Sequence, residues 1–255
     1  NTLFLNIKAI YMFKKNKPKV NEDWFDSDYY HILYKNRDYQ EAEYFSKKLM
    51  TYFSFDKKIK ILDLACGKGR HSVFLNKLGN NVTGVDISSN NIAEAKKNEN
   101  KSLKFHIHDM RLPMNIKFDL VVNLFTSFGY FDNDIDNLKT LISLKNNLKK
   151  NGFGVIDFFN LGYLKNNLVK ENFEIIDSIK FNLKRYIYNS FLIKEIHFNH
   201  NDKNYNFQEK VKALSLNDFK SLFKQANLEI VDIFGDYHLN KFDNINSKRL
   251  IFIVQ

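Results

Sequence analysis

The stretch that decides the fold is residues 61–72, which reads ILDLACGKGRHS. An apolar strand is expected to end here, followed by a turn that contains Gly67 and Gly69 and by a helix that begins at Arg70. Glycine permits such a tight turn, and the first turn of a helix points free backbone N–H groups at a ligand. A G-x-G turn also opens nicotinamide and flavin sites, so the neighbouring residues must decide between the alternatives.

Three neighbouring residues narrow the choice of ligand. Ser72 stands where the dinucleotide fingerprint has its third glycine. Asp63 precedes Gly67 by four residues, where its charge opposes a pyrophosphate but suits an ammonium and a sulfonium. Asp86 ends the next apolar stretch, nineteen residues after Gly67. A carboxylate there can accept hydrogen bonds from both ribose hydroxyls, which predicts a nucleoside ligand without a 2′-phosphate.

Outward from this turn, short apolar stretches alternate with helical patterns. The predicted strands are 59–64, 81–85, 103–107, 118–124 and 153–159, and the predicted helices are 70–78, 90–98 and 134–149, with a turn at Asn151-Gly152. Such alternation is typical of βαβ units and a parallel sheet, so we expect an α/β fold.

Different patterns flank this core, and we expect one domain over 1–255 with 59–160 as its cofactor-binding core. Helical spacing of apolar residues predicts one helix over 28–53, within an N-terminal helical lid at 1–58. Alternation with period two predicts an antiparallel, three-stranded β insertion at 177–213. Ser215 and Asp218 form an N-cap pattern that opens a closing helix, and a final hairpin completes 214–255.

These features together resemble the class I, seven-stranded, Rossmann-like S-adenosylmethionine-dependent methyltransferases. The resemblance covers 60–160, and the closing hairpin is similar to that family's reversed last strand. It implies S-adenosyl-L-methionine as the cofactor, with the adenine flanked by the residues after the third strand and the methyl group lined by the end of the fourth. The cofactor-binding residues implied in this way are Asp63, Ala65, Cys66, Gly67, Gly69, Arg70, Asp86, Ile87, Asp109, Met110, Asn123, Leu124 and Phe125.

A lid and the walls of an acceptor cavity are expected from aromatic residues near the carboxyl edge of the sheet. The segment 29–39 combines aromatic area with an arginine whose planar fork can pair with a carboxylate. The alternative is that this segment only packs the first helix onto the sheet. The predicted substrate or lid residues are Tyr30, Tyr34, Arg37, Phe128, Tyr130, Phe131 and Tyr237.

The acceptor is predicted to be a small molecule. The loop after the fourth strand has no Asn/Asp-Pro-Pro-aromatic motif of amino-methylating DNA enzymes, and Cys66, the only thiol, sits in the cofactor turn. No catalytic residue is assigned, because an in-line displacement at a sulfonium mainly needs orientation and a dry cavity. An RNA methyltransferase and a non-catalytic S-adenosylmethionine-binding protein remain as alternatives.

The composition limits which partners and which cellular location we expect for the protein. The net charge is +10, but the lysines are spread along the chain, so a nucleic-acid partner stays open without being favoured. A single cysteine fits a reducing cytoplasm, and no ligand cluster predicts a metal. No apolar run approaches the ~20 residues that a membrane span needs. The β insertion could also serve as a homo-oligomer interface.

Overall fold

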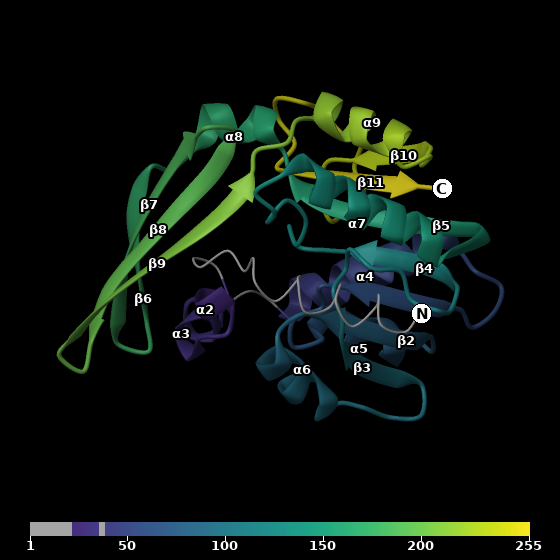
Figure 1. Ribbon diagram of the computed structural model, residues 1–255, viewed down its shortest axis with the longest axis horizontal. Coiled ribbons are helices and arrows are strands. Elements are labelled where there is room, and N and C mark those ends of the chain that lie inside the picture. Colours follow the sequence, from purple (N-terminus) through teal and green to yellow (C-terminus); the bar gives the residue numbers. More distant parts are fainter. Residues whose placement is uncertain (1–21, 36–38) are drawn as a thin grey trace, which may run out of the picture.

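The computed structural model describes residues 22–35 and 39–255, and its main body is a seven-stranded sheet (Figure 1). The strand order is β10-β11-β5-β4-β1-β2-β3. Strand β11 runs antiparallel to both of its neighbours, β10 and β5. The remaining neighbours in this order, from β5 to β3, pair in parallel. The predicted fold class is therefore confirmed. The strands are β1 (Lys60–Leu64), β2 (Asn81–Asp86), β3 (Leu103–Ile107), β4 (Phe118–Asn123), β5 (Leu148–Phe159), β10 (Ile230–Phe234) and β11 (Arg249–Val254).

Helices cover both faces of this sheet. One apolar core lies under α4 (Tyr39–Phe53), α5 (Arg70–Lys77) and α6 (Ser89–Lys96), and the other lies under α7 (Asp134–Asn147) and α9 (Leu216–Gln225). With both faces covered, β1 and β4 are almost continuously apolar and buried. Strand β1 pairs with β2 on one side and with β4 on the other, so the chain reverses direction across the sheet there. The crevice at the carboxyl ends of β1 and β4 is where open α/β sheets bind ligands.

A separate antiparallel sheet projects from this body (Figure 1). Its strands are β6 (Glu171–Ile176), β7 (Ile179–Tyr188), β8 (Phe191–His200) and β9 (Lys203–Lys212). The prediction of three strands starting at 177 is wrong, because β6 adds a fourth. Strand β6 is exposed at five of its six positions and so lacks the alternating pattern. Two-residue turns with positive φ join the strands, at 177–178, 189–190 and 201–202, as tight hairpins require.

The N-terminal region departs most from expectation. The prediction of a single helix over 28–53 is wrong. The helix α3 (Asp28–Leu33) ends before α4 begins at Tyr39, and a short helix, α2 (Glu22–Phe25), precedes α3. The Ser27 side chain caps α3. Trp24 is fully buried against Phe207, with ring centroids 4.8 Å apart. Helices α2 and α3 thus pack on the inner face of the second sheet.

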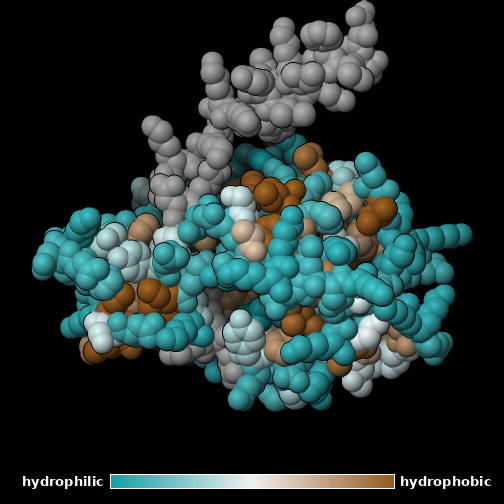
Figure 2. All heavy atoms as spheres, turned by 90° about the horizontal axis from the view of Figure 1, so that it is seen from below, coloured by the Kyte–Doolittle hydropathy of each residue, from teal (hydrophilic) through white to brown (hydrophobic). Residues whose placement is uncertain are grey.

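Two smaller differences follow from tertiary pairing. Residues 151–152 lie inside β5 rather than in a turn, where the pairing with β4 shifts register. A short helix, α8 (Leu161–Asn167), was not predicted; the Asn160 side chain caps it. None of the helices in the described ranges is long and apolar enough to cross a membrane. Hydrophilic side chains cover most of the face in Figure 2, and its hydrophobic residues form separate small groups.

Candidate active site

The glycine turn after β1 has the shape of a ligand cradle. Ala65, Gly67 and Gly69 all have positive φ, at 56°, 57° and 79°. A Cβ added to Gly67 meets no described atom within 4 Å, whereas one added to Gly69 lies 2.5 Å from the Phe105 ring. Gly69 is therefore required for packing, and Gly67 faces open space. Gly69 is also the N-cap residue of α5. Because glycine has no side chain, the N-cap residue itself cannot accept a hydrogen bond from the first N–H groups of that helix.

Asp86 joins the end of β2 to this turn. Its carboxylate accepts hydrogen bonds from the backbone N–H of Gly67, at 2.8 Å, and of Ser88, at 2.9 Å. Burial raises the pKa of Asp86, and the two N–H groups offset part of that rise. A carboxylate has about four lone-pair sites. Acceptor capacity therefore remains for the hydroxyl groups of a ligand.

Asp63 is buried at the end of β1, with 2% of its surface exposed. It accepts a hydrogen bond of 2.6 Å from the hydroxyl of Ser72, the residue in place of the third glycine. Burial raises the pKa of Asp63 to about 7, against the opposing effect of Ser72. The departure from the dinucleotide fingerprint thus has a structural role, because it supplies the partner of a buried acid.

We expect Asp63 to make folding pH-dependent. Its pKa is higher in the folded state, about 7, than its ordinary value of 3.8, so its contribution to stability is full below about pH 4 and is lost as pH rises to 7. The free energy of unfolding of the wild type minus that of Asp63→Asn should fall across this window in urea titrations. Asp119→Asn is the control. Burial acts to raise the pKa of Asp119, but Lys149 and the backbone N–H of Lys60 together lower it below 3.8, so the corresponding difference for Asp119→Asn should change only below pH 4. Parallel curves for the wild type and Asp63→Asn would contradict the assignment.

Asn123 contributes an unpaired acceptor at the end of β4. Its Nδ2 donates to the carbonyl oxygen of Leu64, at 3.0 Å, and lies 3.9 Å from the Met110 sulfur. Its Oδ1 is buried and has no hydrogen-bond partner among the described residues. Buried polar atoms are rarely left unpaired in proteins. This atom, at the junction of β1 and β4, therefore marks a place where a ligand would donate a hydrogen bond.

Asp109, predicted beside the adenine, is held by a residue that sequence reasoning missed. Arg111 contacts both carboxylate oxygens of Asp109, with its Nε at 3.0 Å and its Nη2 at 2.6 Å. Its Nη1 also donates to Asp136, at 2.8 Å, near the start of α7. Arg111 outweighs the effect of burial and lowers the pKa of Asp109. The adjacent Phe131 lies 4.9 Å from the guanidinium, so this predicted wall residue packs on the same group.

The loop after β4 is fixed by a buried ion pair that the sequence did not reveal. Phe125 and Thr126 both have positive φ, at 62° and 58°. The N–H of Phe125 donates to the carboxylate of Asp157, at 2.7 Å. Arg249 donates to that carboxylate at 2.8 Å and to the Thr126 hydroxyl at 2.9 Å. Tyr237, predicted as a wall residue, donates its hydroxyl to Asp157 at 3.0 Å.

The other predicted wall and lid residues have different surroundings. The prediction for Phe128 is wrong: its ring is fully buried in the apolar core, 5.5 Å from that of Phe219. Tyr130 is half-buried and meets Phe25 edge-on, at 5.2 Å. Leu124 is buried in the opposite core, and Arg37 lies outside the described residues.

The segment 22–35 connects the four-stranded sheet to the carboxyl edge of the seven-stranded sheet. Asp26 is hydrogen-bonded to the hydroxyl of Ser88, two residues after Asp86. Burial, together with the charge of Lys68 in the glycine turn, lowers the pKa of His31 to about 4. Tyr30 and Tyr34 pack with the apolar cluster on the second sheet. The segment therefore lies beside the cofactor turn while its aromatic residues anchor on another sheet.

Cys66, in the turn, and His71, in the first turn of α5, have no charge to contribute at neutral pH. Burial raises the pKa of the Cys66 thiol well above its ordinary value. Burial also lowers the pKa of His71 to about 3. A thiolate nucleophile or an imidazolium is thus not available at this turn. Two further residues belong to the predicted cofactor-binding set. The guanidinium of Arg70 lies 4.8 Å from the centre of the Phe125 ring, and the Ile87 side chain is 62% exposed.

Comparison with known proteins agrees with this geometry. The model of a methyltransferase domain family matches residues 55–226, and the chain belongs to that family. A probable S-adenosyl-L-methionine-dependent methyltransferase, TehB of Haemophilus influenzae, is 36% identical over 98 residues. That match covers 33% of this chain and 34% of the relative, so the chain spans about a third of the length of that relative.

Solved structures share the fold. A S-adenosylmethionine-dependent methyltransferase from Clostridium acetobutylicum superposes with a TM-score of 0.75 at 21% identity, covering 89% of this chain and 95% of that one. The sugar N-methyltransferase KedS8 from Streptoalloteichus has a TM-score of 0.70 at 16% identity, covering 88% and 92%. The class I methyltransferase fold identified from the sequence is thereby confirmed. S-adenosylmethionine, the cofactor of this class, fits the open space at Gly67 and the unpaired Asn123 Oδ1.

Proposed function

We propose that this protein transfers a methyl group from S-adenosylmethionine to a small-molecule acceptor. The observation that carries the proposal is the arrangement at the carboxyl edge of the sheet, where Asp86, at the end of β2, is hydrogen-bonded to Gly67 in the open turn after β1. When bound, the sulfonium supplies an electrophilic methyl group. The chain itself has to bind the donor, orient it and exclude water.

Each part of the site has a role in this proposal. Asp86 would accept the ribose hydroxyls, and the glycine turn before α5, where Gly67 faces open space, would receive the carboxylate of the methionine moiety. Asn123 Oδ1 would accept a hydrogen bond from its ammonium group. The segment 22–35, attached at Ser88 by Asp26, would act as the lid over the acceptor. The lid remains part of the proposal, supported by this contact.

A small molecule is favoured over RNA as the acceptor. The net charge of +10 is the one feature in favour of RNA, and three of the lysines, Lys149, Lys210 and Lys212, are paired with carboxylates from other parts of the chain. A sugar N-methyltransferase has the same fold, which supports a small acceptor without identifying it. The single cysteine supports a reducing, cytoplasmic location as a further part of the proposal.

We expect S-adenosylmethionine and its demethylated product to raise the melting temperature, and NAD not to. A ligand at a hundred times its Kd adds about 2.7 kcal/mol of apparent stability. Stabilisation by NAD alone would refute the proposal. In the same experiment, labelled donor is offered with a metabolite extract or with total RNA. Label should enter the small-molecule fraction; saturable labelling of one RNA species would favour the RNA alternative, and tight donor binding without transfer would favour a binding protein.

A further inference from the structure

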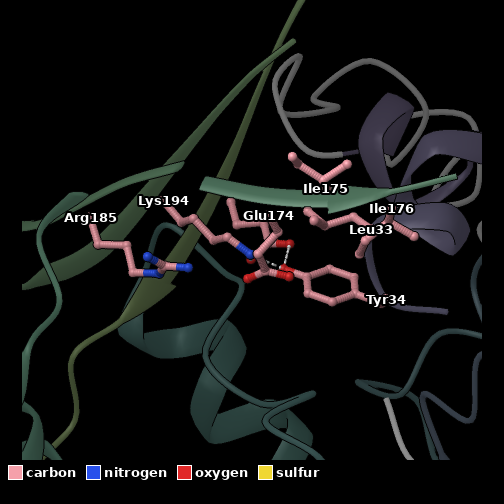
Figure 3. Close-up of a pocket in the computed structure, with 8 residues that line it drawn as sticks. Leu33, Tyr34, Glu174, Ile175, Ile176, Arg185 and Lys194 are labelled. Atoms are coloured by element: carbon pink, nitrogen blue, oxygen red, sulfur yellow. Dashed lines mark hydrogen bonds and ion pairs between the residues drawn. The ribbon is translucent and has the colours of Figure 1, made fainter. Parts of the chain in front are cut away.

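A second cavity, away from the glycine turn, lies on the inner face of the antiparallel sheet. It measures about 590 Å³ and lies between the end of α3 and strands β6 to β9 (Figure 3). Leu33 and Ile176 provide an apolar wall, and Arg185 and Lys194 extend into the same space from neighbouring strands. No role in the methyl transfer proposed above is assigned to Ile176, Arg185 or Lys194.

Three charged residues interrupt an otherwise apolar sheet face here. Arg185 is the cross-strand partner of Lys194, and Lys194 is the partner of Glu209, so the three form one row across β7, β8 and β9. Farther along the same face the rows are apolar, as in Leu183 opposite Ile196. Lys194 is only 9% exposed. Charges in such a position are costly unless they are paired, and a local break in the apolar pattern commonly marks a functional site.

Glu209 is occupied by partners within the protein. Its Oε1 accepts hydrogen bonds from the indole of Trp24, at 2.8 Å, and from the hydroxyl of Tyr34. Lys194 donates to that same hydroxyl, and its Nζ lies 3.9 Å from the other Glu209 oxygen. These contacts hold the ammonium group of Lys194 at the edge of the cavity. The Glu209 charge is thus shared among three donors.

Arg185 has neutral partners instead. Its Nη1 donates to the side-chain oxygen of Asn172, at 2.6 Å, and to the carbonyl of Val169, at 3.4 Å. Among the side chains that the structure describes, those of residues 24–35 and 39–255, no carboxylate lies within ion-pair distance of its guanidinium. Glu174 lines the same cavity from the edge strand β6, where its side chain is exposed to solvent. The guanidinium fork therefore suits a carboxylate or phosphate ligand.

Strand β9 connects the cavity to the loop after β4. Lys212 follows Glu209 along β9 by three residue steps, about 10 Å at 3.3 Å per residue. The N–H of Lys212 donates to the carbonyl of Gly129, in the loop after β4, at 2.8 Å. A small molecule of that length can place one end in the cavity and the other near the loop.

We infer that this cavity binds an anionic group, a carboxylate or a phosphate, of the methyl acceptor, between Arg185 and Lys194. The assignment to the acceptor rests on the proposed function, whereas the anion site does not. Trp24 is the only tryptophan and contacts Glu209, so its fluorescence reports on the site. The two anion probes are inorganic phosphate and malonate, each compared with sodium chloride at equal ionic strength.

Both probes, or one of them, should change Trp24 emission saturably in the full chain. Arg185→Ala should weaken that binding about tenfold or more, because a charge-assisted fork is lost. Arg185→Lys should weaken it less, since the charge remains without the fork. Lys184→Ala is the matched control: it removes the same charge one residue away, on the opposite face, where Lys184 meets Glu171. It should leave the Kd within about twofold.

The outcomes separate the anion site from the methyl-transfer proposal. A response no greater than that of chloride, or an equal loss in Arg185→Ala and Lys184→Ala, would overturn the anion site. The donor-induced melting shift, measured in parallel, tests the cofactor site independently. Inhibition of labelled transfer to the metabolite extract by the bound probe is expected if the acceptor supplies the anion. Saturable binding that leaves transfer unchanged would show that the site binds an independent anion and not a group of the acceptor. That result would overturn the assignment to the acceptor.

Discussion

Asp86→Ala is expected to weaken the binding of S-adenosylmethionine by at least a hundredfold. The carboxylate would accept two ribose hydroxyls, and hydrogen bonds to a charged group contribute about 1.5–3 kcal/mol each. Two such bonds correspond to roughly 3–6 kcal/mol, or about 10² to 10⁴ in Kd. The substitution also removes the acceptor for the Gly67 N–H, which holds the turn against the end of β2. Isothermal titration with the demethylated product gives the Kd directly.

Two further variants locate the origin of that loss. Asp86→Asn keeps one oxygen acceptor and should fall between the wild type and Asp86→Ala. Asp232→Ala removes an exposed carboxylate from the edge strand β10 and should bind like the wild type. Retention of the wild-type Kd, within threefold, by a cooperatively folded Asp86→Ala would show that the ribose is held elsewhere.

Contiguous motifs explain why the residues of the proposed cofactor site could be placed together from the sequence. The turn 61–72 and Asp86 lie on successive βα units, whose parallel arrangement brings their carboxyl ends to one edge. Local sequence is therefore enough to assemble Gly67, Asp63 and Asp86. The same local periodicity predicted the sheet, because strands buried on both faces have continuous apolar stretches.

The remaining features depend on contacts between distant residues. Trp24 and Tyr34 bind Glu209 across more than 170 positions, and no local pattern indicates that pairing. An aromatic segment before the first strand looks the same whether it covers a cofactor or packs on another sheet. Phe128 illustrates the converse error, since a ring next to the site in sequence points into the core. Direction of a side chain in an irregular loop is set by tertiary packing rather than by periodicity.

The loss of Asp157 should destabilise the fold strongly. Its side chain is 1% exposed and forms an ion pair with Arg249, whose side chain is 20% exposed. Removing one partner of a buried pair leaves an uncompensated charge and typically costs about 3–5 kcal/mol. We expect Asp157→Ala to lower the free energy of unfolding by roughly that amount in urea titrations. Asp177→Ala, which removes a carboxylate paired with Lys35 at the surface, should change it by about 0–1 kcal/mol.

The double variant Asp157→Ala with Arg249→Met tests the cause. If the cost arises from the lone buried guanidinium, the double variant should be more stable than Asp157→Ala alone, because no charge is then left unpaired. Part of the loss should persist, since the Phe125 N–H and the Tyr237 hydroxyl still lack their acceptor. That acceptor holds Phe125 and Thr126 in left-handed conformations that cost non-glycine residues about 1–2 kcal/mol each. Donor binding should therefore stay weakened in the double variant, whereas full recovery of both stability and affinity would show that the ion pair does not position this loop.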